Sequence, residues 1–139
     1  MYSLDELKQQ NLEISQLCEV LCILMAQQLL HDNPYVRELL TRFKEKVWVH
    51  LVFEDNTFYT ALLQSDDQSV RNTVQDFHDS AKEIKHRFSA FVRHWCSSPE
   101  SESEHKKLSQ ESSEIFNLIK NRIAYENEKI FPLVEKHLC

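Results

Sequence analysis

The chain of 139 residues contains no glycine and three prolines, and 42% of its residues are hydrophobic. Sheet proteins need glycine in hairpin turns and bulges, so this composition favours helices joined by polar loops in one domain, residues 1–139. The net charge of −6 leaves no basic stripe for phosphates, which argues against nucleic acid as a partner. No apolar run reaches the roughly 20 residues that cross a bilayer, and the polar start MYSLDELKQQ is unlike a signal peptide. We therefore expect a cytoplasmic protein with no membrane partner.

The first stretch with a helical period runs from about Ser3 to Leu30. Ser3, followed by Glu6 three residues later, is typical of a capping box at a helix start. The break HDNP ends this segment. Its inward stripe contains Leu7, Asn11, Ile14, Cys18, Leu21 and Met25.

A second helical stretch is predicted from about Pro34 to Leu63. Pro34 suits the first turn of a helix and follows an asparagine, Asn33, that can cap it. The polar run QSDDQS ends the segment. Its inward stripe contains Val36, Leu40, Phe43, Val47, His50, Glu54, Phe58 and Leu62.

Two further stretches complete the pattern, separated by the polar loop CSSPESESEH. The third stripe contains Val70, Val74, Phe77, Ala81, Ile84, Phe88, Phe91 and Trp95. The fourth stretch runs from about Lys106 to His137, where Pro132 is expected to kink or end the helix. Its stripe contains Leu108, Ile115, Ile119, Arg122, Glu126, Ile130 and Leu133. Four one-sided helices hide their apolar faces only by packing together, which predicts an all-α, up-down-up-down four-helix bundle.

Several polar residues interrupt the inward stripes, where the period calls for apolar ones. They are Asn11, His50, Glu54, Arg122 and Glu126. A buried carboxylate is costly unless it is paired or bound to metal, and bundles build metal sites from such side chains on facing helices. Each residue also has a purely structural interpretation: a hydrogen-bonded core histidine, or a surface ion pair between residues 122 and 126.

Two phrases, HLVFEDNTFYTALL and RIAYENEKIFPLVEKHL, resemble the hemerythrin-like (HHE cation-binding) family, and the resemblance extends over essentially the whole chain. It implies a four-helix bundle around a di-iron site. The family pattern is a histidine from the first helix, HxxxE from the second, a histidine from the third and HxxxE or a related pair from the fourth. His50 and Glu54 match the second motif intact.

The other positions depart from that pattern. Asn11 stands at the first-helix histidine, and Arg122 replaces the fourth-helix histidine while Glu126 is retained. In the third helix the register leaves either His78 or Lys82 at the ligand position, and the phrase EIKHRF favours Lys82. Arginine and protonated lysine have no lone pair to give to a metal.

The resemblance thus implies a degenerate metal pocket, in which Lys82 and Arg122 replace the charge of the metals by pairing with the carboxylates. The predicted pocket is Asn11, His50, Glu54, Lys82, Arg122 and Glu126. Under this interpretation the protein has no cofactor. The alternative is an iron site, mononuclear or di-iron. Its reduced ligand set is His50, Glu54, His78 and Glu126.

The chain offers no catalytic motif, because a glycine-free sequence cannot form phosphate loops or nucleophile elbows. We therefore expect no enzyme but a cytoplasmic regulatory or protein-interaction module with an unidentified protein partner, and a homodimer is possible. The alternative function is binding, storage or sensing of O₂ or iron. Candidate contact regions are the acidic loop Ser97–Glu104 and the aromatic residues Trp48, Tyr59 and Trp95.

The remaining histidines and the cysteines carry weaker expectations. Cys18 and Cys22 lack a CxxC spacing and are predicted to be buried reduced thiols, while Cys139 is expected to be exposed. The histidines expected at the surface are His31, His86, His94, His105 and His137.

Overall fold

The computed structural model describes residues 3–54, 58–96 and 101–138, and for residues 28, 52–54 and 96 it describes the backbone alone. Throughout these ranges the ordered elements are helical. They are α1 (Leu4–Met25), the 3₁₀ turn η1 (Gln28–Leu30), α2 (Pro34–Glu54), α3 (Thr60–Leu62), α4 (Gln68–Cys96), α5 (Glu102–Tyr125), the π-helical segment η3 (Glu126–Ile130) and α6 (Phe131–Leu138).

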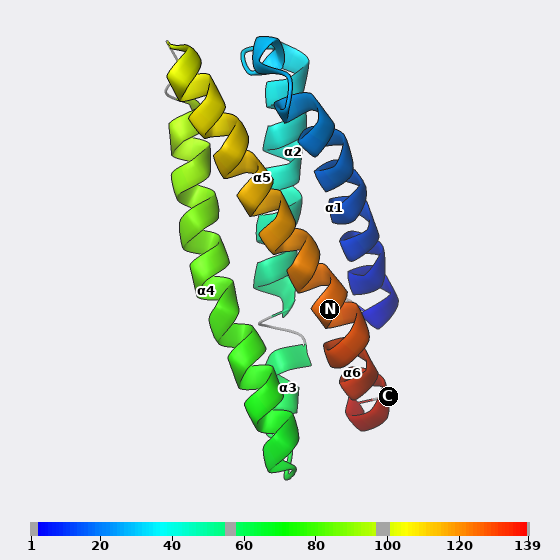
Figure 1. Cartoon of the computed structure of the whole chain (residues 1–139). Helices are drawn as coiled ribbons and strands as arrows, with labels where there is room; N and C mark the ends of the chain where they lie inside the picture. Colours follow the sequence, from blue (N-terminus) through cyan, green and yellow to red (C-terminus); the bar gives the residue numbers. More distant parts are fainter. Residues whose placement is uncertain (1–2, 55–57, 97–100, 139) are drawn as a thin grey trace.

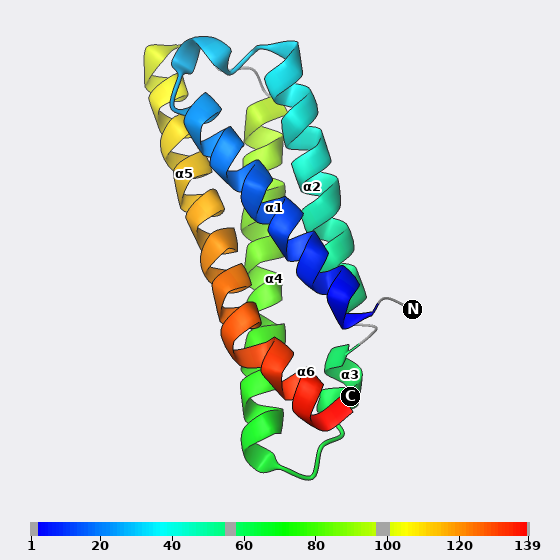
Figure 2. The same ribbon diagram turned by 90° about the vertical axis from the view of Figure 1, so that its right-hand side faces the viewer.

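The four long helices α1, α2, α4 and α5 lie side by side in alternating directions, and α6 continues the line of α5 (Figure 1). In Figure 2, α1 lies between α2 and α5, and it contacts both. This arrangement confirms the predicted four-helix bundle. Among the helices in the described part of the chain, none combines the length and apolarity needed to cross a membrane.

Polar side chains cap the helix starts, as predicted for the first two helices. The Ser3 hydroxyl accepts a hydrogen bond from the Glu6 amide, and Asn33 Oδ1 accepts one from the Tyr35 amide at 2.9 Å. Ser101 caps α5 in the same way. Each cap satisfies an amide that has no partner within its own helix.

The C-terminal helix passes through Pro132 without ending there. A π-helical turn precedes it, in which the Phe131 amide bonds to the Glu126 carbonyl. Pro132 then falls in the first turn of α6, where a missing amide donor costs little. The predicted kink or end at Pro132 is therefore replaced by a π-turn that begins at Glu126.

Among the described residues, buried apolar side chains form two clusters along the bundle. The larger contains aromatic contacts such as Phe43 with Phe116, whose ring centroids are 5.4 Å apart. The smaller contains Tyr59, Leu62, Val70, Val74, Phe77, Ile130 and Val134. Along α5 and η3, the carboxylate Glu126 comes between Ile123 of the larger cluster and Ile130 of the smaller one. A polar layer thus separates the two apolar parts of the core.

Candidate functional site

The polar layer is centred on Glu126, whose side chain is 1% exposed. Its Oε1 accepts hydrogen bonds from Asn11 Nδ2 at 2.7 Å and from His50 Nε2 at 2.9 Å. Its Oε2 accepts a hydrogen bond from the hydroxyl of Tyr59. The donors come from α1, from α2 and from the segment just before α3, so this one carboxylate connects three other parts of the chain.

His50 connects Glu126 to the edge of the bundle. The side chain is 4% exposed, and its Nδ1 lies 2.7 Å from Oε1 of Gln10, which is half-buried on α1. Both ring nitrogens therefore face acceptor oxygens, an arrangement that an imidazolium satisfies by donating twice. A protonated His50 makes its contact with Glu126 a buried, charge-assisted hydrogen bond.

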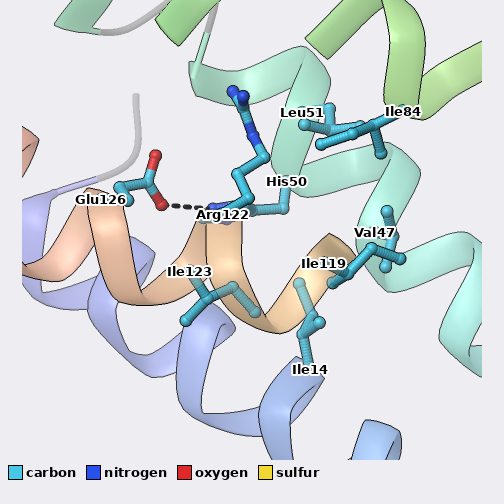
Figure 3. A pocket seen from close by; sticks show the side chains of 9 residues that line it. All are labelled: Ile14, Val47, His50, Leu51, Ile84, Ile119, Arg122, Ile123 and Glu126. Carbon is cyan, nitrogen blue, oxygen red and sulfur yellow. Dashed lines mark hydrogen bonds and ion pairs between the residues drawn. The ribbon is translucent and has the colours of Figure 1, made fainter. Parts of the chain in front are cut away.

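A small cavity of about 20 Å³ adjoins this pair (Figure 3). Its polar lining residues are His50, Arg122 and Glu126, and its volume is enough for about one water molecule. The apolar lining residues are Ile14, Val47, Leu51, Ile84, Ile119 and Ile123.

This bundle, with an inward histidine and carboxylate on facing helices, matches the model of the hemerythrin HHE cation-binding domain over residues 3–134. The chain belongs to the hemerythrin HHE cation-binding family. No curated protein and no solved structure matches it.

Three residues that the sequence resemblance assigned to ligand positions meet in the polar layer. Asn11, His50 and Glu126 are each at most 4% exposed and are joined by direct hydrogen bonds. Asn11 also donates to Asn127 Oδ1 at 3.3 Å, so its amide nitrogen bridges two acceptors of η3. The side chain of Glu54, the second half of the HxxxE motif, lies outside the described residues.

Arg122 lines the cavity with its stem, but its guanidinium turns towards α4 and away from the Glu126 carboxylate (Figure 3). Nη1 donates to the Phe77 carbonyl at 2.9 Å and also to the Ser80 hydroxyl. The guanidinium carbon lies 3.7 Å from the centroid of the Phe77 ring, within the range of a cation–π contact. The contacts described for Arg122 thus fasten α5 to α4.

The prediction that Lys82 points into the pocket is wrong. Its side chain is exposed, because the buried face of α4 runs through Phe77, Ala81 and Ile84, and residue 82 is turned about 100° from residue 81. The α4 residue nearer the polar layer is His78, which is half-buried with its ring 6.5 Å from the Tyr59 ring. An exposed Lys82 does not compensate the charge of the pocket carboxylates.

The sequence interpretation missed the roles of Tyr59 and Gln10. Tyr59 was a candidate surface aromatic, yet it is 2% exposed and bonds to Glu126. Residues 58 and 59 lie in a π-helical turn, which moves Tyr59 off the 3.6-residue period and hides it from pattern analysis. Gln10 is a neighbour of Asn11, and no pattern in the sequence singles it out.

A second buried polar cluster lies at the turn between α1 and α2 and corrects the expectation that His31 is at the surface. His31 is 0% exposed. Its Nε2 lies 2.9 Å from the Met25 carbonyl, and its Nδ1 lies 2.9 Å from Nδ1 of His105 on α5. The Ser109 hydroxyl also donates to the Met25 carbonyl. We call these four residues the His31 cluster.

The other residues predicted to lie at the surface range from exposed to fully buried. His94 is half-buried and pairs with Glu111 at 2.7 Å, while Trp95 is 2% exposed and therefore belongs to the core. Trp48 is 43% exposed. The loop Ser97–Glu104 lies partly outside the described residues.

Cys18 and Cys22, the cysteines whose side chains the structure describes, are free thiols. Cys18 is buried and Cys22 is half-buried, so the prediction of burial holds fully for the first alone. Cys139 lies outside the described residues. Burial in apolar surroundings raises the pKa of the Cys18 thiol to about 12.

The described polar residues around the pocket contact one another directly. His50 and Glu126, which a metal would have to separate, are in direct contact at 2.9 Å. Asn11 turns its amide donor, not a lone pair, towards the same carboxylate. Within the described part of the chain, no three histidine, cysteine or acidic side chains converge as ligands.

Proposed function

We propose that this hemerythrin-type bundle is a regulatory or protein-interaction module whose central pocket is structural. One observation carries the proposal: the buried Glu126 carboxylate is satisfied by Asn11, His50 and Tyr59. Each is a hydrogen-bond donor from the protein itself, so the carboxylate needs no metal to offset its burial.

The identity of the substituted side chains supports the same conclusion. At two positions where the family has histidine, this chain has Asn11 and Arg122. An amide NH₂ and a guanidinium donate hydrogen bonds, whereas a metal needs lone pairs. Iron at this site would have to break the hydrogen bonds that Asn11, His50 and Tyr59 make to Glu126. The donor set thus favours the closed network over an iron centre.

If the pocket is structural, the function resides on the surface of the bundle. No nucleophile or acid–base constellation stands out in the sequence, which supports a binding role rather than catalysis. The partner proposed here is a protein.

Metal analysis tests the proposal directly. We would purify the chain from iron-supplemented culture, measure metal per chain and record an ultraviolet–visible spectrum. The expected result is substoichiometric metal together with cooperative unfolding of the metal-free protein. Stoichiometric iron with an oxo-bridge absorption band would refute the proposal.

A matched set of variants tests the assignment of positions. Asn11→His combined with Arg122→His restores two lone-pair donors at buried or half-buried positions and should raise iron uptake. Lys82→His is the control, because its exposed side chain should leave uptake unchanged. A gain from Lys82→His alone would place position 82 at the ligand position of α4, contrary to its exposure here.

The alternative function, a mononuclear iron or zinc site, makes a different prediction. It would use His50, Glu54, His78 and Glu126, with His78 approaching from α4 beside Tyr59. It predicts one bound metal per chain that is lost in His78→Ala. Equal, low metal content in wild type and His78→Ala would favour the structural pocket.

A further inference from the structure

The outer face of α1 is unusual among the solvent-facing sides of this bundle. α1 lies on the side of the bundle that faces the viewer in Figure 2, with one face packed on α2 and α5. Opposite that buried face, Leu12 is 51% exposed, Val20 is 46% exposed and Ile23 is 70% exposed. Three large apolar side chains thus project into solvent from one helix.

Charge is scarce on the same face. Between residues 14 and 27 the exposed side chains of α1 and its C-cap are Gln16, Glu19, Val20, Ile23, Ala26 and Gln27, which include a single charge. The exposed face of α2, by contrast, carries Arg42, Lys44, Glu45 and Lys46 within five residues. Solvated helix faces are normally charged, whereas the centres of interfaces are depleted in charge. The composition of α1 is therefore that of a contact surface.

The spacing along this face identifies a seam. Leu12, Gln16, Glu19 and Ile23 follow one another at intervals of four, three and four residues, the repeat of a coiled-coil contact. With about 100° per residue they fall within about 60° of one another around the helix. Their order is apolar, polar, polar, apolar. The pattern of apolar and polar residues is therefore the same in both directions along the helix.

We propose that α1 pairs with α1 of a second copy of this chain, antiparallel, to form a homodimer. A two-fold axis between positions 17 and 18 places Leu12 against Ile23 of the partner subunit. The same axis places Gln16 against Glu19 of the partner subunit, so that a side-chain amide donates to a carboxylate. Every contact occurs twice, as an isologous interface requires.

The choice of a second copy over an unrelated partner rests on this self-complementarity. The chain carries a net charge of −6, so copies repel one another through most of their surface. The α1 seam carries a single charged residue, Glu19, and exposes apolar surface, so repulsion between copies is small there. The inference specifies a partner for the interaction role proposed above and rests on that role.

Sedimentation velocity of the full chain in reducing buffer, over a range of concentrations, tests the dimer. The wild type should show a concentration-dependent dimer, and Ile23→Lys should raise its dissociation constant by about tenfold or more, because it buries an unpaired ammonium. Tyr35→Lys, a similar apolar-to-lysine change at a 77% exposed residue on α2, should leave the dimer intact. Both positions are exposed, so the melting temperatures of the monomers should match.

A charge exchange tests the register. Gln16→Glu should weaken the dimer by setting two carboxylates face to face at each symmetric contact. Adding Glu19→Lys to that variant should restore it, because the introduced ammonium then faces the introduced carboxylate across the axis. A monomeric wild type, or a dimer indifferent to Ile23→Lys, overturns the inference, and failure of the exchange to rescue overturns the antiparallel register. These outcomes do not depend on metal content. The proposed α1 dimer and the proposed structural pocket can therefore be contradicted independently of each other.

Discussion

The Glu126 cluster and the His31 cluster, both within the described part of the bundle, are built on different principles. Around Glu126, one carboxylate collects donors from Asn11, His50 and Tyr59, which lie far apart in sequence. Around His31, a neutral ring is compatible with all contacts, because Nε2 donates to the Met25 carbonyl and Nδ1 accepts from a neighbouring ring. The first cluster holds charge between two apolar cores, whereas the second closes a turn.

This difference indicates which cluster contributes more to the stability of the fold. A buried charge that loses its partners leaves a large desolvation cost uncompensated. A neutral ring that loses one partner leaves a smaller cost, and solvent at the end of a bundle can replace part of the lost bond. We therefore expect disruption of the Glu126 cluster to cost more than disruption of the His31 cluster.

The largest effect is expected for Glu126→Ala. The substitution removes the buried carboxylate that accepts hydrogen bonds from Asn11, His50 and Tyr59. The free energy of unfolding should fall by about 3–5 kcal/mol, as measured by urea denaturation followed by circular dichroism.

Two further variants serve as controls for that measurement. Glu128→Ala changes an exposed carboxylate on the same π-segment and should stay within about 0.5 kcal/mol of the wild type. Glu126→Gln preserves the shape and should be intermediate if the alanine variant does not fold. A Glu126→Ala protein as stable as Glu128→Ala would mean that the polar layer contributes nothing.

Tyr59→Phe tests the least expected member of the Glu126 cluster. It removes one donor to a charged acceptor without creating a cavity, so the loss should be about 1.5–3 kcal/mol. Tyr125→Phe, at a 42% exposed tyrosine, is the control and should change little. If Tyr59 acts through the carboxylate, the effects of Tyr59→Phe and Glu126→Gln will be less than additive in a double-mutant cycle.

The sequence predicted the bundle because its helices are strongly periodic, but it misplaced helix ends. The first helix was expected to reach Leu30 and ends at Met25, whose carbonyl accepts hydrogen bonds from His31 and from Ser109 of α5. Those contacts join residues that are distant in sequence or lie in a turn. Periodicity in a single helix cannot report them.

Sequence patterns likewise identified only some of the residues of the candidate site. Asn11, His50 and Glu126 were recognisable because each interrupts an apolar stripe. Tyr59 was missed because a π-turn shifts its phase. Lys82 was misplaced because its register was taken from a resembling phrase, although the stripe through Ala81 turns residue 82 outward.

His105→Ala probes the second cluster and should have a smaller effect than either change around Glu126. It removes the ring that faces Nδ1 of His31, for an expected loss of about 1 kcal/mol. Lys106→Ala, at the next and exposed position of α5, controls for the change in helix propensity. A loss as large as that of Glu126→Ala would abolish the distinction between the two clusters.

The last prediction concerns the ionisation of Cys18, which changes stability only at alkaline pH. Cys18 lies on the same α1 stripe as Asn11 but among apolar side chains. Its pKa is raised to about 12 by burial, so the folded state keeps a proton that the unfolded chain releases above its ordinary value of 9.0. Its contribution to stability is therefore complete below about pH 9 and declines as the pH rises towards 12. The stability advantage of the wild type over Cys18→Ala should shrink across this range. A stability difference between wild type and Cys18→Ala that does not change with pH would contradict this prediction. It would mean that Cys18 ionises as readily in the folded chain as in the unfolded one, despite its burial.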